Sequence, residues 1–386
     1  MRIIEYGILL LFTLPAFAQQ PLSLQDAVRQ AIEKHPSMES SAARVDAAET
    51  KIKQAHSGYL PQLNWQESYA RSDNPVFVFS SLLTQHQFTE RNFAIGTLNR
   101  PDALNNFQSM LTVDQTVYDA GQTKNRKRSA ELGKQLAGEQ VRATRMNVIA
   151  NVVRAYHGAV LAAEVLSVAE EAVRSAEADL KRAEAVRDAG MATDADVLSI
   201  NVHLAAMQEQ KIARGYDLQV ARSALNEALG LPLDTVHDLT TPLTAVVASA
   251  PAVASHEQHA VSERPELRRA NLSAQLAATQ GQLARAAYWP QVSVRGAFEA
   301  DRQEFIRKGG SNWFFGATMR WNLFNGFATK QQVAEAAHQL RAAEAEKKRA
   351  DAGVRLQVRK AHADLQAATE RIEVATASLA AAEESL

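Results

Sequence analysis

The sequence predicts a mainly α-helical protein with a small β part, internally duplicated, with long antiparallel coiled-coil hairpins and four strands in each chain. Three observations support this prediction. A set of landmarks occurs twice in the same order, short segments alternate between apolar and polar residues, and the long stretch 122–188 contains no proline. Four strands are too few to close a membrane barrel on their own, so we expect several copies of the chain to combine them.

Residues 1–18 have the features of a secretory signal peptide. Arg2 precedes an apolar stretch that ends in Ala16-Phe17-Ala18, an A-x-A cleavage site. This stretch is shorter than the roughly 20 residues of a membrane-spanning helix, and no later run approaches that length. We therefore expect residues 1–18 to be removed and the exported chain to be soluble in the periplasm, secreted, or built as a membrane β-barrel.

Composition excludes several classes of function. The formal net charge is −1, with 42 basic and 43 acidic residues, so no overall field would recruit nucleic acid. The chain has no cysteine, which excludes disulfides, thiolate metal sites and cysteine nucleophiles. The sequence contains no nucleophile elbow, phosphate-binding loop, dinucleotide fingerprint or zinc-protease helix. We predict neither an enzyme nor a cofactor.

The duplicated landmarks start with two helical segments of equal length, each bounded by prolines, from Pro36 to Pro61 and from Pro265 to Pro290. Pro61 and Pro290 are expected to mark the change from helix to strand. The strands end in similar turns, each followed by a Thr-Lys pair that opens a long helix. The turn residues are Tyr118, Asp119 and Gly121 in the first half and Phe324, Asn325 and Gly326 in the second. This doubling divides the chain into a first repeat at 19–230, a linker at 231–263 and a second repeat at 264–386.

Four segments alternate at period two, as strands with two different faces do: residues 61–70, 107–118, 290–300 and 312–324. In the last segment Trp313, Phe315 and Trp321 share one face, which we expect to contact lipid. The opposite face carries Arg295 and Glu299, as a water-filled lumen tolerates. Three copies would supply twelve strands and leave no open edge in lipid, which predicts a homotrimer. A soluble sheet packed on a helix would also alternate and is the alternative.

Residues 122–229 are predicted to form a helical hairpin with its tip near residue 190. Apolar residues, many of them alanine, recur at three- and four-residue steps, which is typical of a coiled-coil seam. Gly190 breaks the first helix, and Thr193 with Asp194 supplies N-cap chemistry for the second. Asp188, Asp194 and Asp196 crowd this tip. Threefold symmetry would make them rings of carboxylates at a pore mouth, and helix capping is the alternative interpretation.

The connection between the first two strands, residues 71–106, is the longer of the two strand connections. Its length predicts that this connection lies on the extracellular side of the barrel, where loops are long. The segment 77–83 is unusually apolar for a free loop. We expect it to fold over the barrel mouth, so that deletion of residues 74–104 raises conductance.

Two groups of residues suggest other functions. His256 and His259 are spaced closely enough to share a metal on a helix, but no third ligand stands at a recognised spacing, so we interpret them as solvated histidines. The cluster Lys124, Arg126, Lys127 and Arg128 could contact phosphates of nucleic acid. Its place at the start of a long helix below the barrel favours lipid headgroups or acidic neighbours.

The order of helix, strand, loop, strand and long hairpin, repeated, resembles the outer-membrane efflux protein family typified by TolC. The similarity covers nearly all of the mature chain, starting at Leu22-Ser23-Leu24-Gln25-Asp26-Ala27. It implies a homotrimer with a twelve-stranded barrel in the outer membrane, a periplasmic α-barrel tunnel and an equatorial segment at residues 231–263. Ala189, Gly190 and Met191 would then form a tip that contacts a periplasmic adaptor (membrane fusion) protein, which joins an inner-membrane RND, ABC or MFS transporter.

The resemblance implies a passive exit duct of a tripartite efflux or type I secretion system. The alternative is a soluble periplasmic coiled-coil scaffold or adaptor. Adaptors need a lipoyl-like domain and a β-barrel domain beside the hairpin, and this sequence has no glycine-punctuated run of short strands for them.

The second half departs from the family at its end. In the first half the tip at Gly190 follows a long helix that starts near Lys124, and a helix of the same length from Lys330 would place a second tip near position 396. The sequence ends at Leu386, inside the predicted helix 327–386. We therefore expect the second tip, with the gate residues that the family carries there, to lie outside this sequence, which would make it a fragment.

Overall fold

A computed structural model describes residues 20–244 and 252–384. The predicted signal peptide, residues 1–18, lies outside these residues. The chain divides into two compact units, one formed by residues 1–42, 141–250 and 365–386, and the other by residues 43–140 and 251–364. The helices α2, α5 and α9 each run from one unit into the other. We describe each unit by itself.

Helices dominate the described residues, which confirms the predicted mainly α-helical class with a small β part. The first half contains β1 (Gln20–Leu22), α1 (Leu24–Lys34), α2 (Pro36–His56), β2 (Gln62–Ser72), α3 (Pro75–Thr84), α4 (Ile95–Asn99), β3 (Leu104–Tyr118), α5 (Gln122–Asp188) and α6 (Asp194–Leu229). The second contains β4 (His237–Leu239), α7 (Val253–Glu263), α8 (Pro265–Ala286), β5 (Gln291–Arg302), β6 (Gly309–Arg320) and α9 (Ala328–Glu384). Short 3₁₀ turns follow α2 and precede α4, at Ser57–Tyr59 and Glu90–Phe93.

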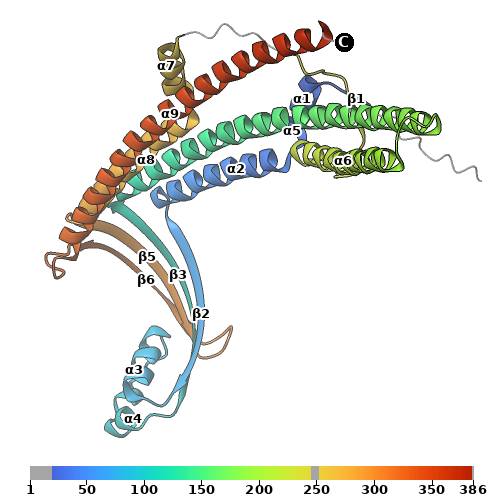
Figure 1. Ribbon diagram of the computed structural model, residues 1–386. Coiled ribbons are helices and arrows are strands. Elements are labelled where there is room, and N and C mark those ends of the chain that lie inside the picture. The colour runs from blue at the N-terminus through green and yellow to red at the C-terminus, as the bar shows by residue number, and fades with distance from the viewer. Residues whose placement is uncertain (1–19, 245–251, 385–386) are drawn as a thin grey trace, which may run out of the picture. The chain divides into compact units, whose positions relative to one another are not determined.

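A four-stranded antiparallel sheet with the strand order β2-β3-β5-β6 is the centre of the second unit (Figure 1). Each strand differs slightly from its predicted range. The first three extend a little beyond the alternating segments, because backbone pairing continues past the point where the side-chain pattern fades. The fourth differs most, since β6 ends at Arg320 and not at residue 324.

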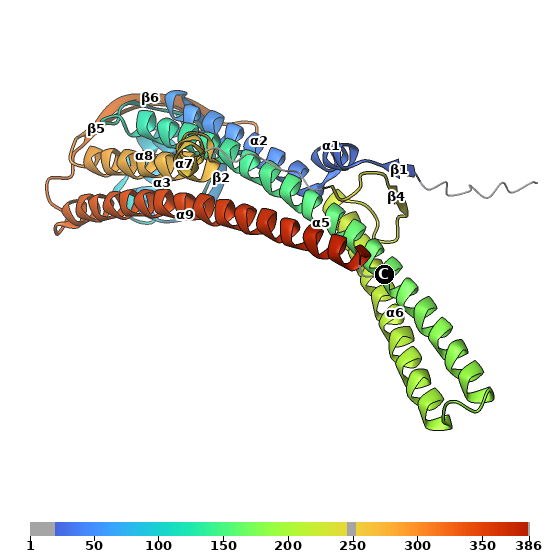
Figure 2. The same cartoon turned by 45° about the horizontal axis from the view of Figure 1, so that its top comes forward.

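The long helices α5 and α6 form an antiparallel hairpin in the first unit, and Figure 2 shows them side by side up to the connecting turn. The seam between them includes Val173, Ala176 and Leu204, which are buried. Alanine and long straight side chains fill both helices, and these residues have high helix propensity. The small seam residues let the two backbones approach closely.

Near the base of the hairpin, Tyr156 lies at the centre of a larger apolar cluster. Its side chain is completely buried, and its hydroxyl group donates a hydrogen bond to the Leu22 carbonyl (2.8 Å) and accepts one from the Thr241 amide (2.9 Å). Strand β1 pairs in parallel with β4 beside this cluster. The region that the sequence suggested as a linker therefore contains a short strand, β4, and a helix, α7.

In the second unit, ion pairs join helix α7 to helix α9. Glu257 of α7 is buried and accepts hydrogen bonds from Arg359 (2.6 Å) and Arg355 (3.5 Å). The hydrogen bond from Arg359 is the main reason that the pKa of Glu257 lies below its usual value. The neighbouring His256 lies beside His362, with ring centroids 6.4 Å apart. Among the residues that the structure describes, no group of three or more histidine or acidic side chains could hold a metal ion.

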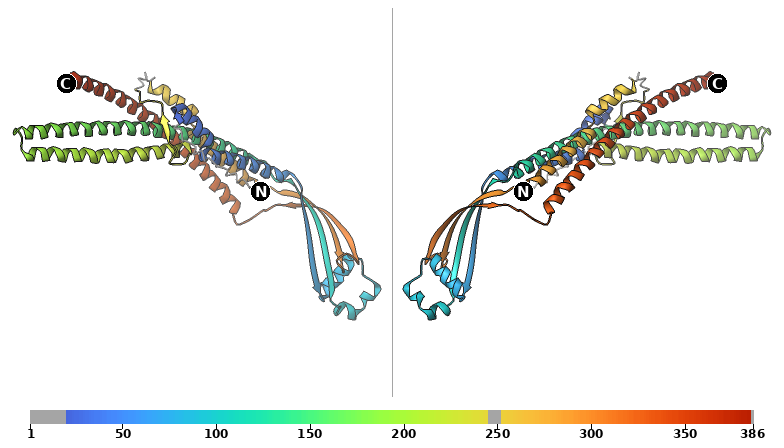
Figure 3. Two further views of the ribbon diagram at one scale, coloured as in Figure 1. Left: turned by 90° about the vertical axis from the view of Figure 1, so that its right-hand side faces the viewer. Right: turned by 90° about the vertical axis from the view of Figure 1, so that its left-hand side faces the viewer.

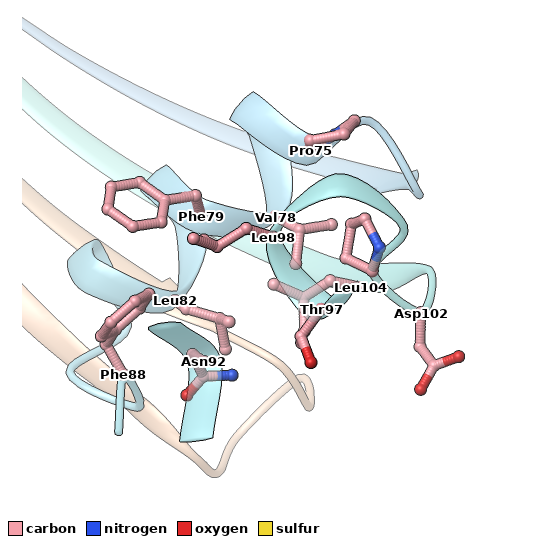
Figure 4. Close-up of a pocket in the computed structure, with 11 residues that line it drawn as sticks. Pro75, Val78, Phe79, Leu82, Phe88, Asn92, Thr97, Leu98, Asp102 and Leu104 are labelled. Atoms are coloured by element: carbon pink, nitrogen blue, oxygen red, sulfur yellow. The ribbon is translucent and has the colours of Figure 1, made fainter. Parts of the chain in front are cut away.

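The connection between β2 and β3 is folded, unlike the loop expected there. Asn74 caps α3 by accepting hydrogen bonds from the amides of Val76 (3.0 Å) and Phe77 (3.2 Å), and Pro75 fits the first turn. Phe88 makes aromatic contacts with Phe79 of α3 and with Phe93 of the 3₁₀ turn, and α3 and α4 line a mostly apolar pocket of about 200 Å³ (Figure 4). Figures 1 and 3 show this segment, residues 75–99, at the end of the sheet away from α8.

One helix among the described residues, α5, contains a stretch that is long and apolar enough to cross a membrane by length and composition. This finding corrects the expectation that no later run approaches spanning length. Part of this stretch packs around Tyr156 in the first unit's core, and 22% of the stretch is buried.

Candidate functional site

One face of the sheet presents large apolar side chains in rows that cross all four strands. Trp65, Leu111, Phe298 and Trp313 are direct cross-strand neighbours on β2, β3, β5 and β6. They are 69%, 38%, 51% and 80% exposed, respectively. Phe315 belongs to the next row on the same face and is 68% exposed. Exposed apolar patches of this extent mark contact with a membrane or another protein.

The opposite face is mostly polar and carries paired charges, although Phe314 also lies on it. Arg295 and Asp114 are cross-strand neighbours and form an ion pair of 2.5 Å. Further along the same face, Gln108 donates a hydrogen bond to Glu299 (2.7 Å), and Asn106 donates one to Asp301 (2.7 Å). Buried polar groups need such partners, and exposed ones need water. This face is therefore suited to a water-filled space.

The apolar face is interrupted by charged side chains that the sequence pattern did not reveal, Glu67 and Arg71 on β2 and Arg302 on β5. Arg302, the last residue of β5, donates hydrogen bonds to Glu67 (2.9 Å) and to Ser109 (2.5 Å), and Ser109 also bonds to Glu67. The side chains of Arg302 and Glu67 are both about one quarter exposed. Pairing lowers the cost of placing these charges on an otherwise apolar surface, and Arg302 lies at the end of its strand.

Trp321 does not lie on the strand as predicted. It follows the last residue of β6, and its indole N–H donates a hydrogen bond to the Tyr288 carbonyl (3.0 Å). The side chain is still half exposed. It has an apolar body and a satisfied polar end, which suits the edge of a membrane better than its middle.

The two turns that join strand to long helix have the same construction. Asp119 accepts hydrogen bonds from the amides of Gly121 (3.0 Å) and Thr123 (2.6 Å). Asn325 accepts from the Thr329 amide (3.4 Å) and donates to the Thr329 hydroxyl (2.8 Å). In both turns a side-chain oxygen therefore caps an amide one helical turn later. Gly121 and Gly326 both adopt positive φ, +82° and +64°, which favours glycine at these positions.

Burial and hydrogen bonding act in opposite directions on Asp119. Burial raises the pKa of its carboxyl group, but the hydrogen bonds from Thr123, Gly121 and Gln122 outweigh it and lower the pKa. Asp119 is therefore a charged cap at neutral pH. Pro61 and Pro290 stand immediately before β2 and β5, where each helical segment has ended.

At the other end of the hairpin, a tight turn joins α5 to α6. Gly190 has φ of +77°, and its amide donates to the Arg187 carbonyl (2.7 Å). Ala189 and Met191 flank it, and Met191 is 75% exposed. An exposed apolar side chain at the end of a long hairpin is available for a partner.

The three aspartates at this tip have local partners. Asp196 completes a capping box with Thr193, whose amide donates to it over 2.9 Å, and this hydrogen bond lowers the pKa of Asp196. Asp188 and Asp194 lie 2.8 Å and 3.9 Å from the guanidinium group of Arg187. The capping expected of Asp194 is thus carried out by Thr193 and Asp196, because α6 begins at Asp194 itself.

The basic residues at the start of α5 also have neighbours. Lys127 and Arg128 lie 4.0 Å and 3.6 Å from Glu131 one turn later, and Arg126 donates to Gln122 over 3.3 Å. Pairs of this spacing stabilise an exposed helix by only a few tenths of a kcal/mol, roughly. Acidic neighbours therefore account for two of these cations.

Sequence reasoning missed the polar contacts of the segment after β2. Gln85, Asn106 and Asp301 are brought together from positions far apart in the chain, and all three are buried. The pair Asn74-Pro75 before an apolar run is a helix-start signal that could have revealed α3. No local signal identifies the partners of Gln85.

Comparison with known proteins agrees with this architecture. The sequence matches the model of the family "Outer membrane efflux protein" over residues 27–231 and 257–386. No curated protein matches it in sequence. Crystal structures of CusC, described with transmembrane channel formation, match with a TM-score of 0.74 and 17% identity, over 93% of this chain and 79% of that one.

Two further structures have the same fold. A membrane protein from Pseudomonas aeruginosa has a TM-score of 0.72 and 20% identity, over 93% of this chain and 79% of that one. The CmeC outer membrane channel of Campylobacter jejuni has a TM-score of 0.70 and 16% identity, over 92% and 75%. The family match spans most of the chain, and the protein therefore belongs to the outer membrane efflux protein family.

Proposed function

We propose that three copies of this chain form the exit duct of a tripartite efflux or secretion system, with one sheet from each copy in a common twelve-stranded barrel. The observation that carries the proposal is the contrast between the two faces of the sheet. The row from Trp65 to Trp313 would face lipid, and the face with the Asp114–Arg295 pair would line the water-filled lumen.

The edges of the sheet explain the need for several copies. Strands β2 and β6 each have one neighbour in the described sheet. An unpaired edge in lipid leaves backbone groups without hydrogen bonds, which costs several kcal/mol for each group, roughly. Since β6 and β2 run in opposite directions, β6 of one copy can pair with β2 of the next in the antiparallel manner of the rest of the sheet.

The hairpin supports a tunnel built from several copies. Ile212, Tyr216 and Val220 recur at every fourth position on α6 and are 62%, 67% and 68% exposed. Positions four apart share one helix face, so the three side chains form an apolar stripe. Helices of neighbouring copies would cover this stripe and enclose the periplasmic passage.

The tip at Ala189, Gly190 and Met191 is proposed to contact the periplasmic adaptor, through which the duct would join an inner-membrane transporter. Asp188, Asp194 and Asp196 would lie near the mouth. Arg187 and the capping box occupy these carboxylates in part, so their effect on passing cations would be modest. Unchanged cation selectivity in the Asp194→Ala, Asp196→Ala variant would exclude such an effect.

The proposal is tested by locating the mature chain and measuring its conductance. We expect it in the outer membrane fraction as an oligomer that heat dissociates, and we expect single channels after reconstitution into planar bilayers. Since the chain has no cysteine, one cysteine on β2 and one on β6 can be scanned together. Disulfide-linked species should stop at three chains. A soluble periplasmic monomer without channel activity would favour a scaffold or adaptor instead.

A further inference from the structure

The segment between β2 and β3 is attached to the polar face of the sheet. Helix α3 contacts β3, β5 and β6. The attachment is made by Thr84, the last residue of α3, and by Gln85, which follows it. Gln85 donates hydrogen bonds to the Asn106 side chain (2.8 Å) and to the Asn105 carbonyl (3.0 Å). The Thr84 carbonyl accepts one from Asn312 (3.1 Å). Asn106 and Asn312 belong to the face that carries Arg295 and not to the face of Trp313.

The hydrogen bonds continue beneath this segment as a buried chain. Asn106 accepts from Gln85 and donates to Asp301, and the exposed fractions of Gln85, Asn106 and Asp301 are 0%, 9% and 0%. We call these three residues the latch. The remaining side-chain oxygens of Gln85 and Asp301 have no hydrogen-bond partner among the described residues. Separating the segment from the sheet would expose every member of the latch.

The sheet is shaped to receive the segment at Gly310. A Cβ atom at this position would lie only 2.5 Å from the ring of His86, which directly follows Gln85. Non-bonded carbon atoms do not approach this closely, so a side chain here would displace His86. His86 also lies 3.4 Å from the Asn312 side chain. Glycine at 310 thus provides the flat place on which the ring rests.

From this geometry we infer that residues 75–99 form a lid that narrows the outer end of the lumen and limits the size of what passes. The inference rests on the proposed function, which assigns the polar face to the lumen. Each of three copies would contribute one lid. The apolar core of the lid around Phe79, Phe88 and Leu98 (Figure 4) keeps it folded as a unit, and the latch fixes it to the wall.

The test measures access to the lumen past the lid, so that a narrower point elsewhere does not matter. Ser293→Cys places the only thiol on the polar face near the start of β5. Intact cells are treated with a bulky, membrane-impermeant polymer maleimide and with a small one. Gln85→Ala removes the latch without changing the barrel wall. Ser80→Ala is the matched control, because its hydroxyl bonds only to the carbonyls of Val76 and Phe77 within α3.

We expect Gln85→Ala and Gly310→Val to speed the labelling of Cys at position 293 by the bulky reagent, with Ser80→Ala unchanged. Deletion of residues 74–104 should have the largest effect. Equal labelling rates in all these variants, with the heat-dissociable oligomer intact, would overturn the lid. Failure of even the small reagent to reach position 293 in the deletion variant would instead refute the lumen assignment on which the lid depends.

Discussion

The stability cost of replacing Trp313 by arginine distinguishes a sheet whose apolar face contacts lipid from one whose apolar face contacts water. Trp313 lies near the middle of β6, which runs from Gly309 to Arg320, and it is 80% exposed in one chain. Arginine on the lipid face of a membrane barrel costs about 2–4 kcal/mol near the midplane. At a site that water covers, the same change would stay within about 0.5 kcal/mol. A cost of about 2–4 kcal/mol corresponds to roughly 30-fold to 1000-fold in the folding equilibrium of each chain.

The matched control is Thr318→Arg, which introduces the same residue on the same strand. Thr318 lies on the polar face, next to Ser293 in the sheet register, and is exposed. We would measure the temperature at which the detergent-extracted oligomer dissociates, together with the amount that reaches the outer membrane. Trp313→Arg should lower both strongly, and Thr318→Arg should lower neither. Equal behaviour of the two variants would refute the assignment of the faces.

Three further predictions follow from single groups. Asp119→Ala and Asn325→Ala should each cost about 1 kcal/mol, as lost helix caps do, measured by thermal unfolding. Because the pKa of Asp119 is lowered in the folded protein, its contribution should be full above the unfolded value near about 4 and fade as the pH falls through the folded value, whereas that of Asn325 should not depend on pH. Tyr156→Phe leaves the Thr241 amide without its partner and the Leu22 carbonyl with only the Thr240 amide, so it should cost about 1–3 kcal/mol and speed hydrogen exchange in β1 and β4; unchanged exchange would contradict the role of the hydroxyl. Burial lowers the pKa of His237, so the neutral form is favoured in the folded protein, and stability should decrease as the pH falls from about 6.5 toward the folded value; His237→Gln should flatten this dependence, and an unchanged pH profile would refute it.

The sequence pattern predicted the long elements well, because their signals are local and repeated. Alternation located all four strands, and the absence of proline together with Gly190 located α5 and the turn after it. Strand ends were less accurate. Trp321 continued the alternation beyond the last residue of β6, because side-chain pattern and backbone pairing stop at different points.

The contacts that fix the site were mostly beyond local prediction. Arg302 and Glu67 occupy the apolar face, although the alternation around them is otherwise regular, and only the register brings them together. The latch joins Gln85, which follows α3, to Asn106 and Asp301 on two neighbouring strands that are far apart in the sequence. Such sites depend on which strands are neighbours, and a single sequence does not specify that order.

The central claim is that this sheet is stable in a membrane only when several chains close it into one barrel. Native mass spectrometry of the mature protein, extracted from outer membranes and released from detergent in the instrument, tests the claim directly. The predicted result is a complex of three chains that falls apart or precipitates when detergent is removed beforehand. A single chain that stays folded and soluble in detergent-free buffer would contradict it.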